Sequence, residues 1–175
     1  MRIEVDKLKE ASTMFASDYA LDELPLEDEL MRLASEAKVE GRASKKREQI
    51  RLQGMINASV EVACDRCAAP VIVPLNTNFD VTYLPVEALT VDAEATELQE
   101  DDLNFAAYEG DSIDIDELAR EQILLALPAR QLCREDCQGL CPACGADLNT
   151  RTCQCEQQEV DPRWAALAAL KKGDK

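Results

Sequence analysis

Eight cysteines in four closely spaced pairs constrain the fold of this chain more than any other feature of its sequence. The pairs are Cys64 and Cys67, Cys133 and Cys137, Cys141 and Cys144, and Cys153 and Cys155. Cysteines that only fill a hydrophobic core have no reason to recur at such short spacing. Thiolates that converge on one point are the usual ligands of a structural zinc ion. The pattern therefore predicts one or two structural Zn²⁺ sites.

The spacing also favours one grouping of the ligands. The segment Cys141-Pro-Ala-Cys144-Gly145 is typical of a zinc knuckle, in which a tight turn points two thiolates at one metal ion. Cys153 and Cys155 follow within a short loop, so we expect these four thiols to form one site. The second expected site takes the other four: Cys64, Cys67, Cys133 and Cys137. A single site with four spare thiols fits the sequence as well.

Two further interpretations of the cysteines stay open. They are reduced thiols in an ordinary core, or Cys64-Asp-Arg-Cys67 is a redox motif in which Arg66 favours a thiolate. The redox interpretation lacks the strand-to-helix context of a thioredoxin-like motif. A catalytic zinc needs an open coordination position, which ligation by cysteine alone does not suggest. We therefore expect a closed site that serves the fold.

The 175-residue chain contains no histidine. This excludes Ser-His-Asp and Cys-His catalysis, histidine-ligated metals and acid–base chemistry by imidazole. The sequence predicts no catalytic residue, and we expect a protein that is not an enzyme.

Charge is distributed unevenly along the chain. Lys and Arg total 19 against 35 Asp and Glu, which gives a formal net charge of −16. No Lys or Arg occurs from Cys67 to Ala119, where acidic residues accumulate. Such a chain is repelled by phosphate at long range, because binding driven by counterion release needs clustered cations.

One dense basic cluster remains as the candidate RNA-binding surface: Arg42, Lys45, Lys46, Arg47 and Arg51. A local basic surface acts within the Debye length of about 8 Å, whatever the net charge. The alternative is an ordinary solvated turn. We hypothesise a split surface, in which this cluster contacts rRNA and the acidic stretch 87–111 engages a basic ribosomal protein or assembly factor.

Alternating apolar residues predict two long strands. Residues 50–64 place Ile, Leu, Ala, Val and Cys mostly on one face, and the alternation resumes over 71–83. The two form an antiparallel hairpin with Cys64 and Cys67 at its turn. Residues 38–43 are expected to form a preceding strand, with a polar turn over 44–48, and residues 3–8 another short strand.

Helices are expected in three places. One begins near Asp114, with Glu117 in a capping-box-like position, and stops before Pro128. A second runs from Asp161 to Lys172 and docks through Trp164, since about ten residues are too few for a stable isolated helix. Residues 26–37 fit a third.

The predicted fold class is α+β: an antiparallel β-sheet with flanking helices and a C-terminal cysteine-rich zinc module. We expect residues 1–85 to form the N-terminal region and sheet, 86–112 an acidic linker, and 113–175 the helix, the cysteine module and the last helix. No apolar run approaches the roughly 20 residues that span a bilayer, and the first residues lack the apolar segment of a signal peptide. A cytoplasmic location is expected, because a reducing compartment keeps thiols free for metal.

Four sequence blocks resemble the bacterial YceD family, also called DUF177. They are Cys64-Asp-Arg-Cys67 after a long alternating strand, the segment from Ile115 to Pro128, the segment from Cys133 to Gly145, and Asp161-Pro-Arg-Trp-Ala-Ala-Leu. The blocks keep the order of the family from about residue 38 to 172, whereas the first 37 residues match loosely.

Members of that family are described as large ribosomal RNA subunit accumulation proteins. The resemblance implies a role in large-subunit assembly or in stability of the 23S rRNA, with precursor subunits as partner and no small-molecule substrate or membrane. No catalytic residues are attributed to the family, so the resemblance implies none in this chain. Two other classes remain: a zinc-ribbon adaptor that binds a protein partner without contacting RNA, and a thiol- or metal-responsive switch.

Overall fold

The computed structural model describes residues 1–8, 12–26, 31–89, 105–155 and 163, and the chain divides into two compact units. We call residues 1–63 and 70–131 the sheet unit, and residues 64–69 and 132–175 the cysteine unit. These units differ from the three consecutive segments expected from the sequence. Strand pairing and helix packing join distant segments, so helix and sheet fall in one unit while the turn at 64–69 joins the other.

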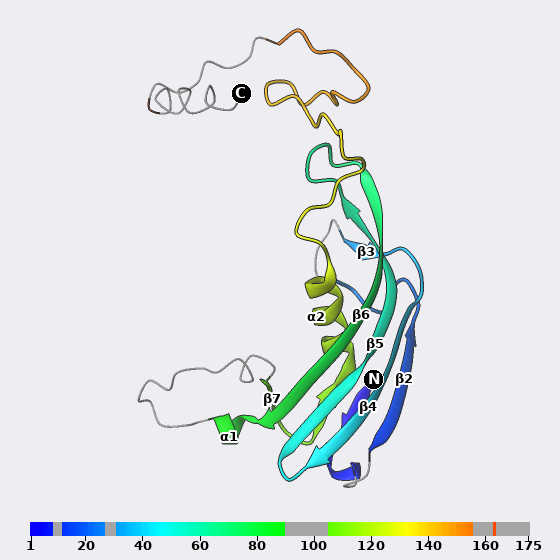
Figure 1. The fold of residues 1–175 in the computed structure, drawn as a ribbon, viewed down its shortest axis with the longest axis vertical. Coiled ribbons are helices and arrows are strands. Elements are labelled where there is room, and N and C mark those ends of the chain that lie inside the picture. Colours follow the sequence, from blue (N-terminus) through cyan, green and yellow to red (C-terminus); the bar gives the residue numbers. More distant parts are fainter. Residues whose placement is uncertain (9–11, 27–30, 90–104, 156–162, 164–175) are drawn as a thin grey trace, which may run out of the picture. The chain divides into compact units, whose positions relative to one another are not determined.

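A six-stranded sheet dominates the sheet unit (Figure 1). Its strands are β2 (Thr13–Tyr19), β3 (Arg32–Leu33), β4 (Ala37–Lys46), β5 (Gln49–Ala63), β6 (Pro70–Pro85) and β7 (Phe105–Tyr108). The order is β2-β4-β5-β6-β7, and β3 pairs with β5 beside this path. All pairs are antiparallel except β6 with β7, which is parallel.

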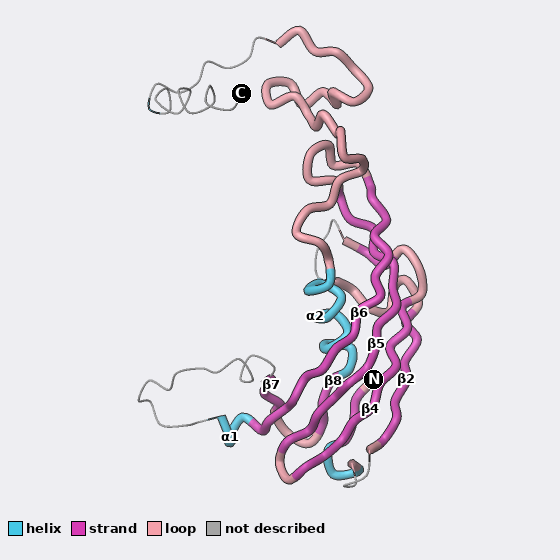
Figure 2. Tube along the Cα trace, viewed as in Figure 1, coloured by secondary structure: helices cyan, strands magenta, loops and turns pink. Residues whose placement is uncertain are grey.

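Smaller elements complete the sheet unit. β1 (Arg2–Glu4) pairs antiparallel with β8 (Ser112–Asp114), and a 3₁₀ turn, η1 (Val5–Lys7), follows β1. Two helices are present among the described residues, α1 (Val86–Leu89) and α2 (Ile115–Ala126). A mostly antiparallel sheet with few helices agrees with the expected α+β class, and Figure 2 shows how strongly strands outweigh helices.

The period-two pattern is confirmed in the long hairpin. On β5 the inward residues Ile50, Leu52, Ile56 and Val60 are fully buried, while Arg51 lies on the opposite, exposed face. β5 and β6 stay in register from Ile50 opposite Tyr83 to Ala63 opposite Pro70. The apolar face of the sheet therefore forms the main wall of the core.

Helix α2 closes that core. Its apolar face, formed by Ile115, Leu118, Ala119 and Ile123, is buried. The Asp114 side chain caps the helix by accepting a hydrogen bond from the backbone N–H of Asp116 at 2.9 Å. The predicted start near Asp114 and stop before Pro128 are confirmed, since α2 ends at Ala126.

Two glycines let aromatic rings cross the centre of the sheet. Phe15, Gly41, Gly54 and Phe79 form one row across β2, β4, β5 and β6. The two phenyl centroids are 6.5 Å apart. A Cβ on Gly54 would lie 2.2 Å from the carbonyl oxygen of Glu40 and 2.6 Å from the Phe79 ring, so only glycine fits.

Several sequence expectations need correction. The predicted strand at 38–43 is confirmed but extends to Lys46, so the polar turn narrows to Arg47 and Glu48, where Arg47 has φ 58°. The predicted strand at 3–8 gives way after Glu4 to η1. The acidic linker expected at 86–112 contains α1 and β7, because β6 offers a free edge to which Phe105–Tyr108 adds.

The expected helix over 26–37 is wrong where the structure describes it. Arg32–Leu33 pairs with β5 as β3, and Ala37 opens β4, since backbone pairing with the long strand outweighs the local helical spacing. Residues 27–30 lie outside the described residues, as do most of the acidic stretch (90–104) and the expected last helix except Arg163. No helix in the described part of the chain has the length and apolar character to cross a membrane.

Candidate metal centres

Two loops of the cysteine unit have the same backbone hydrogen bonds. In the loop that begins at Cys64, the Ala68 N–H donates to the Cys64 carbonyl at 2.9 Å and the Cys64 N–H donates to the Ala69 carbonyl at 2.8 Å. In the loop that begins at Cys141, the N–H groups at the equivalent positions donate to the equivalent carbonyls, both at 2.8 Å. Each Cys-x-x-Cys segment is therefore the same turn.

Both turns need a left-handed residue immediately after the second cysteine. Gly145 has φ 70° and Ala68 has φ 57°. Glycine adopts this conformation freely, whereas an L-residue pays a steric cost of roughly 1–2 kcal/mol. The sequence showed a knuckle at 141–145 because of its glycine. The turn expected at Cys64 and Cys67 has alanine at that position, so its likeness to the knuckle is not visible in the sequence.

The first tetrad gathers Cys64, Cys67, Cys133 and Cys137. Its four sulfur atoms lie within 4.8 Å of one another. The Sγ atoms of Cys64 and Cys137 are 3.9 Å apart, and those of Cys67 and Cys133 are 3.6 Å apart. Zn–S bonds of about 2.3 Å in a tetrahedron place sulfurs about 3.8 Å apart, whereas a disulfide brings them to about 2.05 Å. The spacing fits a shared metal ion.

The second tetrad gathers Cys141, Cys144, Cys153 and Cys155, again within 4.8 Å of one another. The Sγ atoms of Cys153 and Cys141 are 3.3 Å apart. All eight cysteines are free thiols in the structure. The structure thus gathers the cysteines in the two groups of four that the spacing favoured, and both groups are positioned to bind a metal ion.

Polar groups surround the sulfurs of the first tetrad. The Cys133 N–H and the Asn149 side-chain amide donate to the sulfurs of Cys64 and Cys137, each at 3.4 Å. The Arg66 guanidinium donates to the Cys137 carbonyl at 2.6 Å. Donors of this kind orient thiolate ligands and stabilise their charge. The Arg66 side chain therefore holds the loop that carries Cys137.

Asn149 was missed by the sequence interpretation. Besides its bond to Cys137, its side-chain oxygen accepts from the Gln138 N–H at 2.8 Å and from Arg134 at 2.9 Å. Its own N–H donates to the Asp147 carboxylate at 2.9 Å. One amide side chain thus connects the loop of the first tetrad to the chain that follows the second knuckle. No spacing rule marks such a residue.

Within each tetrad the thiols differ in acidity. Backbone N–H groups, that of Cys133 first, lower the pKa of Cys64 to about 6, and those of Cys144 and Ala143 lower the pKa of Cys141 to about 6. The neighbouring thiol of Cys67 raises the pKa of Cys133 to about 12, and that of Cys153 raises the pKa of Cys155 to about 12. Cys64 and Cys141 therefore lose their protons more readily than Cys133 and Cys155, and an incoming cation must displace the protons that remain.

The described residues of the cysteine unit form almost no apolar core. Its buried side chains, among the described residues, are those of Cys64, Cys137 and Cys141. Leu140 is 42% exposed, and a single isolated bridge between Leu140 and Asp147 is the only β pairing within this unit as described. Small units that bury so few apolar groups are usually stabilised by disulfides or a metal ion.

The five predicted RNA-binding residues lie in the sheet unit, around the β4–β5 turn. Arg42, Lys46 and Arg51 lie on the exposed face of the sheet, and Lys45 lies on the other face. Lys45 has the same strand parity as buried Ala43, and its ammonium donates to the Val5 carbonyl at 3.1 Å. Arg51 is held by Asp80 through two hydrogen bonds of 2.7 and 2.5 Å. The remaining three cations, Arg42, Lys46 and Arg47, are exposed.

A family model described as large ribosomal RNA subunit accumulation protein YceD matches residues 52–171 of the chain. This segment contains both tetrads, the β5–β6 hairpin and α2. No solved structure matches the chain.

Curated relatives agree with the family match. A chloroplastic protein of Arabidopsis thaliana, named large ribosomal RNA subunit accumulation protein YCED homolog 1, is 29% identical over 149 residues, which are 73% of this chain and 46% of that protein. The Bacillus subtilis protein YlbN is 28% identical over 172 residues, 98% of this chain and 95% of that protein. A Mycobacterium tuberculosis protein is 30% identical over 70% of this chain and 56% of its own length. The chain thus spans about half the length of the plant and mycobacterial relatives.

Proposed function

Since the chain belongs to the YceD family, we propose that it supports accumulation of large-subunit rRNA as a non-catalytic ribosome-assembly factor. Two structural zinc ions hold the cysteine unit of this factor in its binding conformation. The observation that carries the proposal is that two sulfur tetrads occur in a unit whose described residues bury only three side chains, all of them cysteines. A reducing cytoplasm suits this function, because it keeps all eight thiols free for metal.

Zinc fits the donor set better than other common metals. Calcium and magnesium take oxygen ligands, whereas four thiolates in a tetrahedron are typical of structural zinc or of iron. The two Cys-x-x-Cys turns and their N–H donors match the geometry of closed zinc sites. With four protein ligands per ion no coordination position stays open for substrate, so the metal serves the fold.

The large-subunit precursor is the proposed partner, and the exposed side of the β4–β5 turn is the proposed RNA contact. Arg42, Lys46 and Arg47 supply the charge there, since Lys45 and Arg51 are engaged within the sheet unit. Lys46 also lines a cavity of about 430 Å³ together with Phe105, whose side chain is 37% exposed. In this proposal an unpaired base stacks on Phe105 while the cations contact phosphates.

The test is rRNA content in cells. A strain without the protein should show a lowered ratio of large-subunit to small-subunit rRNA, and the wild-type chain should restore it. The triple variant R42E/K46E/R47E should fail to restore the ratio. K7E/R32E/K38E is the matched control, because it reverses three exposed cations whose ion pairs contribute little to stability.

A second variant separates the metal from the RNA contact. C64S/C137S removes two buried ligands of the first tetrad, and we expect it to lose metal and to fail in the same complementation. Copurification with a protein outside the ribosome would support the adaptor function instead. Rapid titration of thiols in the metal-loaded protein would support a redox switch. Full restoration by R42E/K46E/R47E would contradict the RNA contact.

A further inference from the structure

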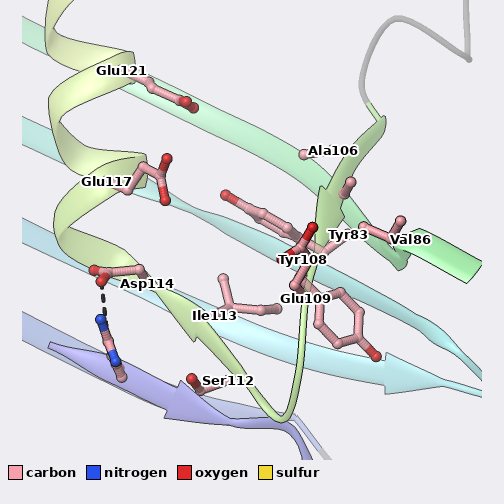
Figure 3. A pocket seen from close by; sticks show the side chains of 12 residues that line it. Tyr83, Val86, Ala106, Tyr108, Glu109, Ser112, Ile113, Asp114, Glu117 and Glu121 are labelled. Carbon is pink, nitrogen blue, oxygen red and sulfur yellow. Dashed lines mark hydrogen bonds and ion pairs between the residues drawn. The ribbon is translucent and has the colours of Figure 1, made fainter.

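An acidic cleft lies in the sheet unit between β7, β8 and α2 (Figure 3). Neither the cysteines nor the residues of the β4–β5 turn line it. Its volume is about 630 Å³. Four carboxylates and two tyrosines line it, with a single cation among the lining residues: Glu109, Asp114, Glu117, Glu121, Tyr83, Tyr108 and Arg2. We infer that this cleft binds a lysine or arginine side chain from a basic segment of a partner protein.

The carboxylates of the cleft are unequally satisfied. Asp114 is engaged twice, because Arg2 donates to it at 3.2 Å and it caps α2. Glu117 and Glu121 have no hydrogen bond or ion pair with any residue that the structure describes. They lie one turn apart on α2, where like charges repel and destabilise a helix. Arg120 attracts Glu121 through space, but no described residue forms an ion pair with either carboxylate at the cleft.

Tyr83 gives the second, independent observation. Its side chain is only 8% exposed, and Figure 3 shows the ring reaching across the cleft toward the turns of α2 that carry Glu117 and Glu121. No described residue makes a hydrogen bond with its hydroxyl group. No side-chain oxygen of the described residues is both buried and without a hydrogen-bond partner, so the unpaired Tyr83 hydroxyl is the part of this buried side chain that opens into the cleft. A bound donor would satisfy the Tyr83 oxygen.

The local electrostatics also favour a cation. Burial, with Glu121 and Glu117 adding to it, raises the pKa of Tyr83 to about 12. Burial and the neighbouring Glu117 raise the pKa of Glu121. Burial is the largest cause of both shifts, and Arg120 opposes the shift of Glu121. The smaller contribution of the neighbouring carboxylates is a negative potential, which a positive charge in the cleft would offset.

The geometry distinguishes an organic cation from a metal ion. Within the described part of the chain, three or more metal-ligand atoms converge within 4.8 Å only in the two cysteine tetrads. The cleft carboxylates are too dispersed to enclose a calcium or magnesium ion, which needs oxygens at 2.0–2.6 Å. An ammonium or guanidinium group carries several donors and reaches separated acceptors, and it is attracted to tyrosine rings.

The chemistry of the surrounding sequence favours a polypeptide as the source of that cation. The stretch from Cys67 to Ala119, which includes β7 and β8, contains no Lys or Arg. A partner with several successive basic side chains is attracted by all the negative charge of this stretch, whereas a single small cation is attracted only by the carboxylates of the cleft. The inference goes beyond the proposed RNA contact and does not depend on it.

The test uses the full metal-loaded chain and a fluorescent decapeptide of alternating arginine and glycine, followed by anisotropy at about 0.1 M salt, where the Debye length is about 10 Å. E117Q/E121Q should raise the Kd about tenfold, which corresponds to about 1.4 kcal/mol. The charge-matched control D18N/E40Q, on exposed positions of β2 and β4, should raise it less than about twofold, because those charges are screened.

A third variant tests Tyr83 directly. Y83F removes only the hydroxyl group, and it should weaken peptide binding by about threefold without lowering the urea midpoint of unfolding. Equal effects of E117Q/E121Q and D18N/E40Q would overturn the inference, because they would indicate attraction by net charge alone. Competition by spermidine at the same concentration as the peptide would overturn the assignment to a polypeptide, and so would a wild-type chain that does not bind the peptide.

Discussion

The sheet unit and the cysteine unit are ordered by different forces. In the sheet unit, 15- and 16-residue strands and an amphipathic helix bury a continuous aliphatic core. In the described cysteine unit, the buried side chains are those of three cysteines, and loops make up almost the whole backbone (Figure 2). The first unit is held by exclusion of water from apolar surface, and we propose that the second is held by metal–sulfur bonds.

The difference shows how one chain can combine two kinds of stability. A sheet with long-range pairing tolerates surface variation, because many side chains share the burial energy. A unit held by eight sulfurs depends on each ligand and on the few residues that set the turns. In the sheet unit, most single mutations should therefore cause small losses of stability. In the cysteine unit, mutations of a few residues should cause large losses.

Removal of metal is the change with the largest expected effect. A high-affinity chelator at neutral pH should abolish amide-exchange protection over residues 64–69 and 132–155 and leave β4, β5 and β6 protected, because the cysteine unit, as described, buries only three cysteine side chains. Hydrogen exchange followed by mass spectrometry measures both units in one sample. Loss of protection in both units, or in neither, would break the comparison.

A change in the centre of the sheet should have the reverse effect. Gly54→Ala places a methyl group 2.2 Å from the Glu40 carbonyl oxygen, and we expect a loss of about 3 kcal/mol in the free energy of unfolding of the sheet unit. The metal content should not change. Ser59→Ala, on the exposed face of the same strand, is the control. An unfolding transition of Gly54→Ala that matches wild type would refute the close packing of the Phe-Gly-Gly-Phe row.

The equivalent change in the cysteine unit acts through backbone conformation alone. A Cβ on Gly145 meets no atom within 4 Å, so Gly145→Ala costs only the left-handed φ of 70°, about 1–2 kcal/mol. This should appear as a roughly tenfold weaker affinity of one metal ion of two, measured by chelator competition. Ala68→Gly, at the equivalent turn position, should not weaken the other ion. Equal loss at both sites would argue against two independent turns.

The smallest expected effect concerns the exposed pair Arg51 and Asp80. Hydrogen bonds from Arg51 lower the pKa of Asp80 below its ordinary value of 3.8. A carboxyl group with a lowered pKa stabilises the fold above the ordinary pKa, and this contribution disappears as the pH falls through the lowered pKa. Asp80→Asn should therefore reduce the urea midpoint slightly at pH 7 and not at pH 2, because both side chains are exposed and screened. A large effect at pH 7 would show a structural role for the pair.

The sequence predicts individual strands and helices only where their local pattern is strong. The alternation from Ile50 to Val62 specifies a half-buried strand, and Asp114 and Pro128 mark the ends of α2. β2 lacks such a signal, because Tyr19 is its one buried residue. β7 could not be predicted, since only its parallel pairing with β6, across residues far apart in sequence, makes Phe105–Tyr108 a strand.

The cysteine spacing predicted the ligands of the candidate metal centres, but it did not predict the residues that surround them. Close pairs of cysteines and the glycine after Cys144 indicated two groups of four. The left-handed Ala68 and the bridging Asn149 carry no sequence mark, because their roles depend on tertiary contacts. Strand alternation could have separated Lys45 from Lys46, since Lys45 is on the same face of β4 as buried Val39 and Ala43, and Lys46 is on the opposite face.

X-ray absorption of the purified chain, combined with its metal content, tests the central claim most directly. The account predicts two zinc ions per chain, each with four sulfur neighbours at about 2.3 Å and no oxygen or nitrogen ligand. A metal-free chain whose cysteine unit still resists hydrogen exchange would contradict it.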